Sequence, residues 1–269
     1  MNHTAPIGIF DSGIGGLTVA RAIYTLLPNE STIYLGDTAR VPYGPKSPAT
    51  VERYSHEILE WLVAQGVKAV VVACNTATAH ALPSLQAAVE IPVIGVVQPG
   101  ARAAVAATTG GGVGVIGTAG TIASGAYRRA LLEARPGLRV IEQACPLLVP
   151  LVEEGWFAHP ATRMIAEVYL QPIIAAEVDA LVLGCTHYPL LKPLLGDLLP
   201  ADVRMIDSAD ETAHDVARVL QQADLAAPTG AAARHRWAAT DDVERFARLG
   251  SLFTGRIVSD VELVRLGGA

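Results

Sequence analysis

Residues 181–190 read LVLGCTHYPL: an apolar run stops at a glycine, and a cysteine, a threonine, a histidine and a proline follow it. The run 181–184 is typical of a buried strand, after which a new element begins. A second stretch, VVVACNTATAHALPSL at 70–85, has the same order of apolar run, cysteine, nearby threonine and predicted helix. This recurrence predicts two related α/β units.

Short apolar runs alternate with helical patterns along the rest of the chain. Because these runs are continuously apolar, they predict parallel sheets that are covered on both faces. A weaker likeness between 8–23 and 114–131 extends the repeat, which reflects either a duplication or a supersecondary pattern common to two units. The predicted strands are 7–10, 32–35, 69–73, 93–96, 113–116, 140–141, 180–183 and 204–206, and the predicted helices include 17–27, 49–65, 123–134, 160–176 and 209–223.

The fold class expected from these patterns is α/β, with two pseudo-symmetric lobes, mainly parallel sheets and an active site in the cleft between the lobes. We expect the first lobe to comprise residues 1–97 and 208–269 and to carry Cys74. The second lobe, residues 98–207, is expected to carry Cys185.

Composition excludes several classes of function. The chain has 269 residues and a formal net charge of -6, which argues against a nucleic-acid surface. No apolar run approaches the roughly 20 residues that span a bilayer, and the N-terminus has no signal-like region. Three cysteines without CxxC spacing argue against a disulfide framework and a zinc site. We therefore expect a cytoplasmic protein without a metal ion, a membrane or a nucleic-acid partner.

Two of the cysteines occupy positions where chemistry is expected. Ligands of parallel sheets bind beyond the carboxyl ends of the strands, and Cys74 and Cys185 both lie there and precede predicted helices. A helix N-terminus lowers a thiol pKa from about 8.5, so a cysteine there can exchange protons. Two thiols facing each other across a cleft suit the removal of a proton from one face of a carbon and its return to the other. Cys145 lacks this pattern, and we interpret it as structural.

The glycine-rich segment DSGIGG at 11–16 follows the first predicted strand. Its glycines allow a ligand to approach the backbone, Ser12 can donate a hydrogen bond, and Asp11 can hold an ammonium group or cap a helix. The segment GVGVIG at 112–117 matches a dinucleotide fingerprint, but its middle is itself the predicted strand, so we reject that reading. No lysine sits at a predicted strand end, which argues against pyridoxal phosphate.

Five segments together resemble the glutamate racemase family: GIFDSGIGGLTV at 8–19, DTARVPYGPKS at 37–47, ACNTATA at 73–79, CPLLVPLVEEG at 145–155 and GCTHYPLL at 184–191. The likeness runs in order from about residue 7 to 210, and 236–250 fits the family's terminal strand and helix. The resemblance implies interconversion of L- and D-glutamate without a cofactor, to supply D-glutamate for peptidoglycan. It also implies two facing α/β domains and, in many members, a homodimer.

The same resemblance implies roles for individual residues. The catalytic cysteines correspond to Cys74 and Cys185, and the supporting acids and bases to Asp11, Glu153 and His187, although Glu154 could share the role of Glu153. The substrate contacts correspond to Asp11, Ser12, Tyr43, Gly44, Asn75, Thr76, Thr118, Thr121, Thr186 and His187.

Three other functions fit parts of the pattern. An aspartate racemase would share the chemistry and differ only in pocket length. A two-lobed binding protein would explain the cleft but not two thiols at matching strand ends. A hydrolase that uses Cys185 as nucleophile and His187 as base would leave Cys74 idle.

Overall fold

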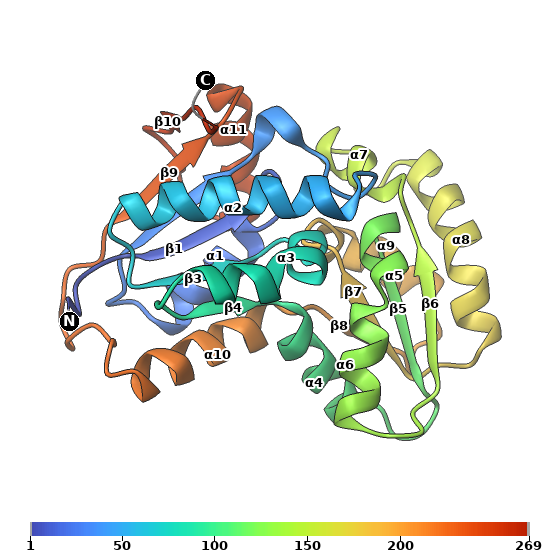
Figure 1. Cartoon of the computed structure of the whole chain (residues 1–269). Coiled ribbons are helices and arrows are strands. Elements are labelled where there is room, and N and C mark those ends of the chain that lie inside the picture. The colour runs from blue at the N-terminus through green and yellow to red at the C-terminus, as the bar shows by residue number, and fades with distance from the viewer. Residues whose placement is uncertain (1, 268–269) are drawn as a thin grey trace.

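Within residues 2–267, which the computed structural model describes, the chain forms two β-sheets with helices on both faces of each (Figure 1). The larger sheet has the strand order β10-β9-β2-β1-β3-β4, and the smaller has β6-β5-β7-β8. All paired neighbouring strands are parallel. The strands are β1 (Ile7–Asp11), β2 (Thr32–Gly36), β3 (Ala69–Val72), β4 (Val93–Gly95), β5 (Val113–Gly117), β6 (Val140–Ala144), β7 (Ala180–Gly184), β8 (Arg204–Ile206), β9 (His235–Ala239) and β10 (Glu262–Leu263).

The helices bury the apolar strands on both sides. In the larger sheet, α1, α10 and α11 cover one face and α2 and α3 the other; in the smaller sheet, α4 and α6 lie opposite α7, α8 and α9. The helices are α1 (Leu17–Leu26), α2 (Pro48–Ala64), α3 (Asn75–Ala88), α4 (Val97–Ala107), α5 (Ala119–Ser124), α6 (Ala126–Ala134), α7 (Leu148–Glu153), α8 (Pro160–Ala175), α9 (Lys192–Leu198), α10 (Ala209–Gln222) and α11 (Val243–Thr254), with 3-10 turns η1 (Thr38–Arg40) and η2 (Tyr188–Leu191).

Four strands of each sheet follow the same order. In the larger sheet β1 pairs with β2 and β3, and β3 pairs with β4; in the smaller sheet β5 pairs with β6 and β7, and β7 with β8. Cys74 therefore follows β3, and Cys185 follows the equivalent strand β7. We call the larger sheet with α1–α3, α10 and α11 the first lobe, and the smaller sheet with α4–α9 the second. The predicted α/β class with two similar lobes is confirmed.

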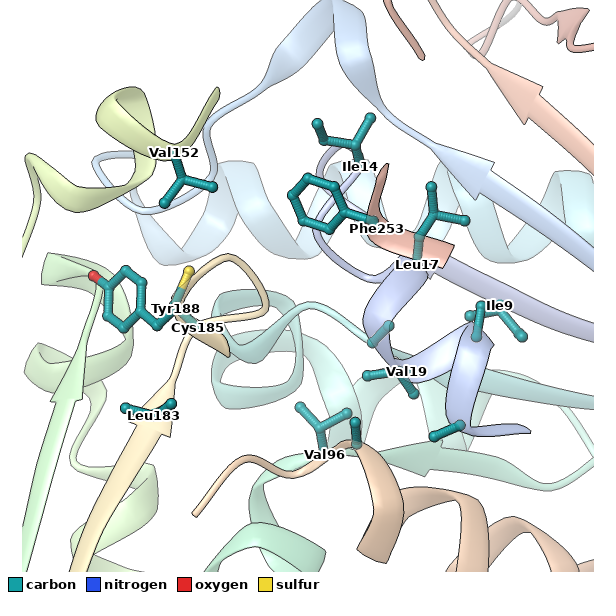
Figure 2. Packing of buried hydrophobic residues seen from close by; sticks show 14 of the residues in the cluster. Ile9, Ile14, Leu17, Val19, Val96, Val152, Leu183, Cys185, Tyr188 and Phe253 are labelled. Atoms are coloured by element: carbon teal, nitrogen blue, oxygen red, sulfur yellow. The ribbon is translucent and has the colours of Figure 1, made fainter. Parts of the chain in front are cut away.

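An apolar core joins the two lobes. One cluster of buried side chains continues from the α1 face of the larger sheet to the α7–α9 face of the smaller sheet. Figure 2 shows Ile9, Leu17 and Phe253 of the first lobe on one side of this cluster, and Leu183 and Tyr188 of the second lobe on the other. The lobes are consequently packed against each other near Cys185.

All eight predicted strands are present, with ends that shift by one residue in most cases. The strand predicted at 140–141 continues to Ala144. The prediction was too short because the second half of this edge strand has half-exposed polar residues instead of an apolar run. The helix predicted at 123–134 is present from Ala126 to Ala134 as α6, but it is interrupted at Gly125. Gly125 takes the left-handed conformation at φ 63°, which ends α5 at Ser124 and lets α6 start in a new direction at Ala126.

Candidate active site

Cys74 lies at the N-terminus of α3. It is the residue that caps this helix, and its Sγ accepts a hydrogen bond from the backbone N–H of Ala77 at 3.5 Å. Its thiol lies 3.7 Å from Oγ of Ser12 in the loop after β1. The carboxyl ends of β1 and β3 are neighbours in the sheet, and this adjacency brings the loop and the thiol together. The predicted position before a helix N-terminus is confirmed for this cysteine.

The pKa of Cys74 moves in the direction opposite to the one expected from a helix N-terminus. Burial of the thiol and the nearby charge of Asp11 raise its pKa to about 12, although the Ala77 N–H and Ser12 favour the thiolate. Desolvation outweighs the helix dipole because the thiol is almost completely buried. Burial thus favours the protonated thiol of Cys74 over its thiolate.

Cys185 follows β7 but does not stand at the N-terminus of an α-helix, in contrast to the sequence prediction. A 3-10 turn begins only at Tyr188, and the seven-residue α9 follows it. The partner of the thiol is instead His187, whose Nδ1 lies 3.8 Å from Sγ of Cys185. Nε2 of the same ring lies 3.1 Å from Oε1 of Glu153 at the end of α7. A thiol, an imidazole and a carboxylate thus form a chain.

His187 and Glu153 stabilise each other's charged forms. Burial disfavours the imidazolium of His187, yet its hydrogen bonds and charge interactions with Cys185 and Glu153 raise its pKa to about 10. The pKa of Glu153 is lowered, because the hydrogen bond from His187 and the charges of His187 and Arg245 outweigh desolvation. Glu154 is exposed, and its carboxylate lies 3.6 Å from Arg245. Of the two acidic residues, the one that contacts His187 is Glu153.

Asp11 lies at the contact between the lobes. Its Oδ2 accepts the backbone N–H of Gly13 at 3.0 Å, and its Oδ1 accepts the hydroxyl of Thr186 from the second lobe at 3.4 Å. Burial raises the pKa of this carboxyl, and the nearby His187 and the hydrogen bonds only partly counter the effect. Asp11 therefore links the Cys74 lobe to the residues that follow Cys185.

The two lobes touch through a reciprocal pair of glycines. A Cβ on Gly15, in the loop after β1, would lie 2.3 Å from Oγ1 of Thr186 and 2.5 Å from Nδ1 of His187. A Cβ on Gly120, at the corresponding place after β5, would lie 3.2 Å from Cγ2 of Thr76. Each glycine lets one lobe approach the residues beside the other lobe's cysteine.

Three hydroxyl groups form a second contact across the lobes. Oγ1 of Thr76 lies 2.8 Å from Oγ1 of Thr118 and 3.1 Å from that of Thr121, and the last two are 3.0 Å apart. Thr118 also caps α5 by accepting the N–H of Thr121. Hydroxyl groups can rotate their hydrogens, so this cluster can turn donors toward an anionic group.

A cavity between the lobes has both thiols in its wall. Its accessible interior measures only about 20 Å³. Predicted site residues make up most of the wall, whereas Asp11, Glu153 and Thr121 stand behind it, in contact with Thr186, His187 and Thr76. The wall comprises Ser12, Val41, Pro42, Tyr43, Gly44, Cys74, Asn75, Thr76, Thr118, Val149, Cys185, Thr186 and His187.

The loop with Tyr43 and Gly44 depends on a buried carboxylate that we did not predict. The Tyr43 hydroxyl donates to Oδ2 of Asp37, which also accepts Nε of Arg40 at 2.7 Å. Oδ1 of Asp37 accepts the hydroxyl of Thr240 at 3.0 Å. The Tyr43 hydroxyl hydrogen is therefore already engaged. Asp37 lies in the quoted segment 37–47, so the resemblance contained the signal for it.

Another unpredicted residue, Tyr127 of α6, donates its hydroxyl to Oδ1 of Asn75 at 2.6 Å. No local pattern marks this tyrosine, because its partner lies in the other lobe. Cys145 is fully buried in the core, and its backbone oxygen accepts the hydroxyl of Tyr188 at 2.8 Å.

Residues 2–267 contain no group of three or more His, Cys, Asp or Glu side chains that could hold a metal ion. None of the helices there combines the length and the apolarity that crossing a membrane requires.

Comparison with known proteins agrees with this geometry. Residues 15–216 match the model of the Asp/Glu/hydantoin racemase family. A glutamate racemase of Geobacter metallireducens is 52% identical over 97% of this chain and 96% of the relative, and one of Neisseria meningitidis is 48% identical over 97% of both chains.

Solved structures show the same likeness. The glutamate racemase RacE1 of Bacillus anthracis has a TM-score of 0.94 and 42% identity, with 98% of both chains covered. The glutamate racemase of Francisella tularensis, solved in complex with D-glutamate, has a TM-score of 0.91 and 36% identity, with the same coverage. With two thiols in one cavity, a matching family model and full-length relatives, the chain belongs to the Asp/Glu/hydantoin racemase family and is an amino-acid racemase.

Proposed function

We propose that this protein interconverts L- and D-glutamate without a cofactor, by proton transfer between the α-carbon and two cysteines. The observation that carries the proposal is the position of two buried thiols, after equivalent strands of the two lobes, in the wall of one cavity. One sulfur, as thiolate, removes the α-proton, and the thiol on the opposite side donates its proton to the other face of the carbon. One C–H bond breaks and another forms, and the two sulfurs exchange protonation states.

The two cysteines have different neighbouring residues that can support proton transfer. Cys74 is a thiol near Asp11, and the chain of His187 and Glu153 serves Cys185. The protonated Cys74 suits the role of proton donor when Cys185 acts as the base. Following the family resemblance, we assign the proton of L-glutamate to Cys185 and that of D-glutamate to Cys74.

The negative charge on the α-carbon has to be stabilised by the protein itself in a reaction without an electron sink. Donors fixed at the site and the exclusion of water provide this stabilisation. Candidates are the hydroxyls of Thr76 and Thr118, both in the cavity wall.

The substrate assignment and the biological role rest on the relatives. We propose glutamate as the substrate in preference to aspartate, because glutamate racemases resemble this chain over nearly its whole length. We propose that its D-glutamate serves peptidoglycan synthesis, and that the protein works in the cytoplasm, where a reducing environment keeps the cysteines as thiols.

We also propose that the chain passes from the first lobe to the second between residues 97 and 98, and returns between residues 207 and 208. The first position lies at the start of α4, between β4 of the larger sheet and β5 of the smaller. The second lies between β8 and α10, which packs against α1. Both connections are short, which suits a hinge.

The test is racemisation by purified protein that has been dialysed against a chelator under reducing conditions. L-glutamate, L-aspartate and L-glutamine are each incubated with wild type, Cys74→Ser and Cys185→Ser, and the enantiomers are separated by chiral chromatography. We expect only wild type to racemise glutamate, because each direction needs both thiols. In deuterated water, early product should contain deuterium while remaining substrate stays protiated. Equal deuterium in both from the start, or activity restored only by an added cofactor, would contradict the proposal.

A further inference from the structure

Tyr127 joins the two lobes at the side chain next to Cys74. It lies on α6 in the second lobe and is completely buried. Its hydroxyl donates to Oδ1 of Asn75, the first helical residue of α3 in the first lobe, at 2.6 Å. Asn75 is itself buried and lines the cavity. A short, fully buried hydrogen bond therefore connects the second lobe to the cavity wall of the first.

The tyrosine is held where the connections between the lobes meet. A Cβ on Gly184, at the end of β7, would lie 3.1 Å from its ring. A Cβ on Gly100 of α4 would lie 3.2 Å from its hydroxyl and 3.2 Å from Cβ of Ser208. These neighbours come from the end of β7 and from both segments that pass between the lobes. The ring has little freedom to move, so its hydroxyl is a fixed point.

This hydrogen bond determines how the amide of Asn75 is oriented. Burial raises the pKa of Tyr127 although a hydrogen bond with Ser208 lowers it, so the hydroxyl keeps its hydrogen, which it donates to Asn75. Only the carbonyl oxygen of an amide can accept that hydrogen. Nδ2 of Asn75, with two N–H donors, is consequently turned away from Tyr127. With the oxygen tied down, the NH₂ group is the part of the side chain left for a ligand in the cavity.

We propose that Tyr127 is a positioning residue that holds the Asn75 amide with its NH₂ group toward the substrate, so that it donates to a carboxylate of the amino acid. The inference rests on the proposed function. The bond crosses between the lobes, so the amide is fixed only while they are together. A freely rotating amide would present its oxygen, which repels a carboxylate, as often as its NH₂ group.

The first experiment replaces Tyr127 by phenylalanine, which keeps the ring and removes the donor. The carboxylate is present in the substrate and in the transition state alike. Loss of a hydrogen-bond donor to it therefore weakens the binding of both by the same amount. We expect the KM for L- and D-glutamate to rise by the same factor, about tenfold, while kcat stays nearly unchanged. The matched control is Tyr24→Phe, a buried tyrosine on α1 whose ring lies against His235, away from the cavity. It should leave both constants unchanged.

The second experiment removes the partner. In an Asn75→Ala background, Tyr127→Phe should have no further effect, because the amide that it positions is gone. The proposal is overturned if Tyr127→Phe keeps the wild-type KM, or if it raises KM equally in the Asn75→Ala background. Wild-type protein without racemase activity would instead refute the proposed function itself, so the two failures are distinct.

Thermal unfolding of each variant shows whether the change affects folding. If Tyr127→Phe does not fold, Asn75→Asp tests the same idea from the other side. An aspartate still accepts the tyrosine hydrogen but offers no N–H, so KM should rise although the bond between the lobes remains. A wild-type KM for Asn75→Asp would refute the role of the amide.

Discussion

Replacing Gly15 by alanine should push the two halves of the site apart. The new Cβ would lie 2.3 Å from Oγ1 of Thr186 and 2.5 Å from Nδ1 of His187, whereas ordinary contacts begin near 3.4 Å. Relief of this overlap requires the residues after Cys185 to retreat by about 1 Å. Misplacement of reacting groups by about 1 Å can cost about 100-fold in rate, so we expect kcat/KM to fall by that order.

The assay is racemisation of L-glutamate, with the thermal unfolding midpoint measured on the same samples. Gly196→Ala is a suitable control, since its Cβ would meet only Cε of Met205, at 3.5 Å, and alanine is the better helix former by about 1 kcal/mol. This control should keep wild-type activity. Near wild-type kcat/KM in Gly15→Ala would refute the argument that this contact sets the distance between the two sides.

Three further predictions concern buried charges. Asp37→Asn should raise the KM for glutamate about tenfold with a smaller effect on kcat, because the anchor of the Tyr43 loop loses its charge; an unchanged KM in steady-state kinetics would count against this. Lys68→Met should cost about 3–5 kcal/mol in urea unfolding, since it leaves Glu30, paired with Lys68 at 2.6 Å, as an uncompensated buried charge, and Glu30→Gln in the same chain should restore part of the loss. The stability that His187 contributes relative to His187→Gln should be complete below about pH 6.5 and disappear as the pH rises through 10, because its pKa is raised in the folded protein; an equal difference in unfolding free energy at pH 6 and pH 10 would contradict that sign.

The strands were predictable because their signal is local. The runs at β3 and β7 are fully buried, and such continuously apolar stretches have few alternatives to a central parallel strand. The sequence HRWAA of β9 has no such run, and only the family resemblance pointed to a strand there. The two-residue β10 is exposed and lies at the sheet edge, so it left no pattern to find.

The site was predictable as far as it follows from strand ends. Both cysteines, Ser12 and Thr118 come directly or nearly directly after strands, and parallel strands bring such positions to one edge. The bond between Tyr127 and Asn75 depends on how the lobes face each other, for which a single chain carries no local signal. The raised pKa of Cys74 was missed for a related reason, since desolvation is set by the other lobe as well as by its own helix.

The small cavity has a consequence for the pace of catalysis. An interior of about 20 Å³ holds a water molecule but not an amino acid, which has several times as many atoms. Every molecule of substrate must then be admitted, and every product released, by movement of the residues that form the cavity wall. Turnover cannot exceed the frequency of this gate, and such motions commonly take microseconds to milliseconds. The small cavity that protects the reacting carbon from water thus also sets an upper limit on turnover. If opening of the cavity limits turnover, a more viscous solvent should lower kcat.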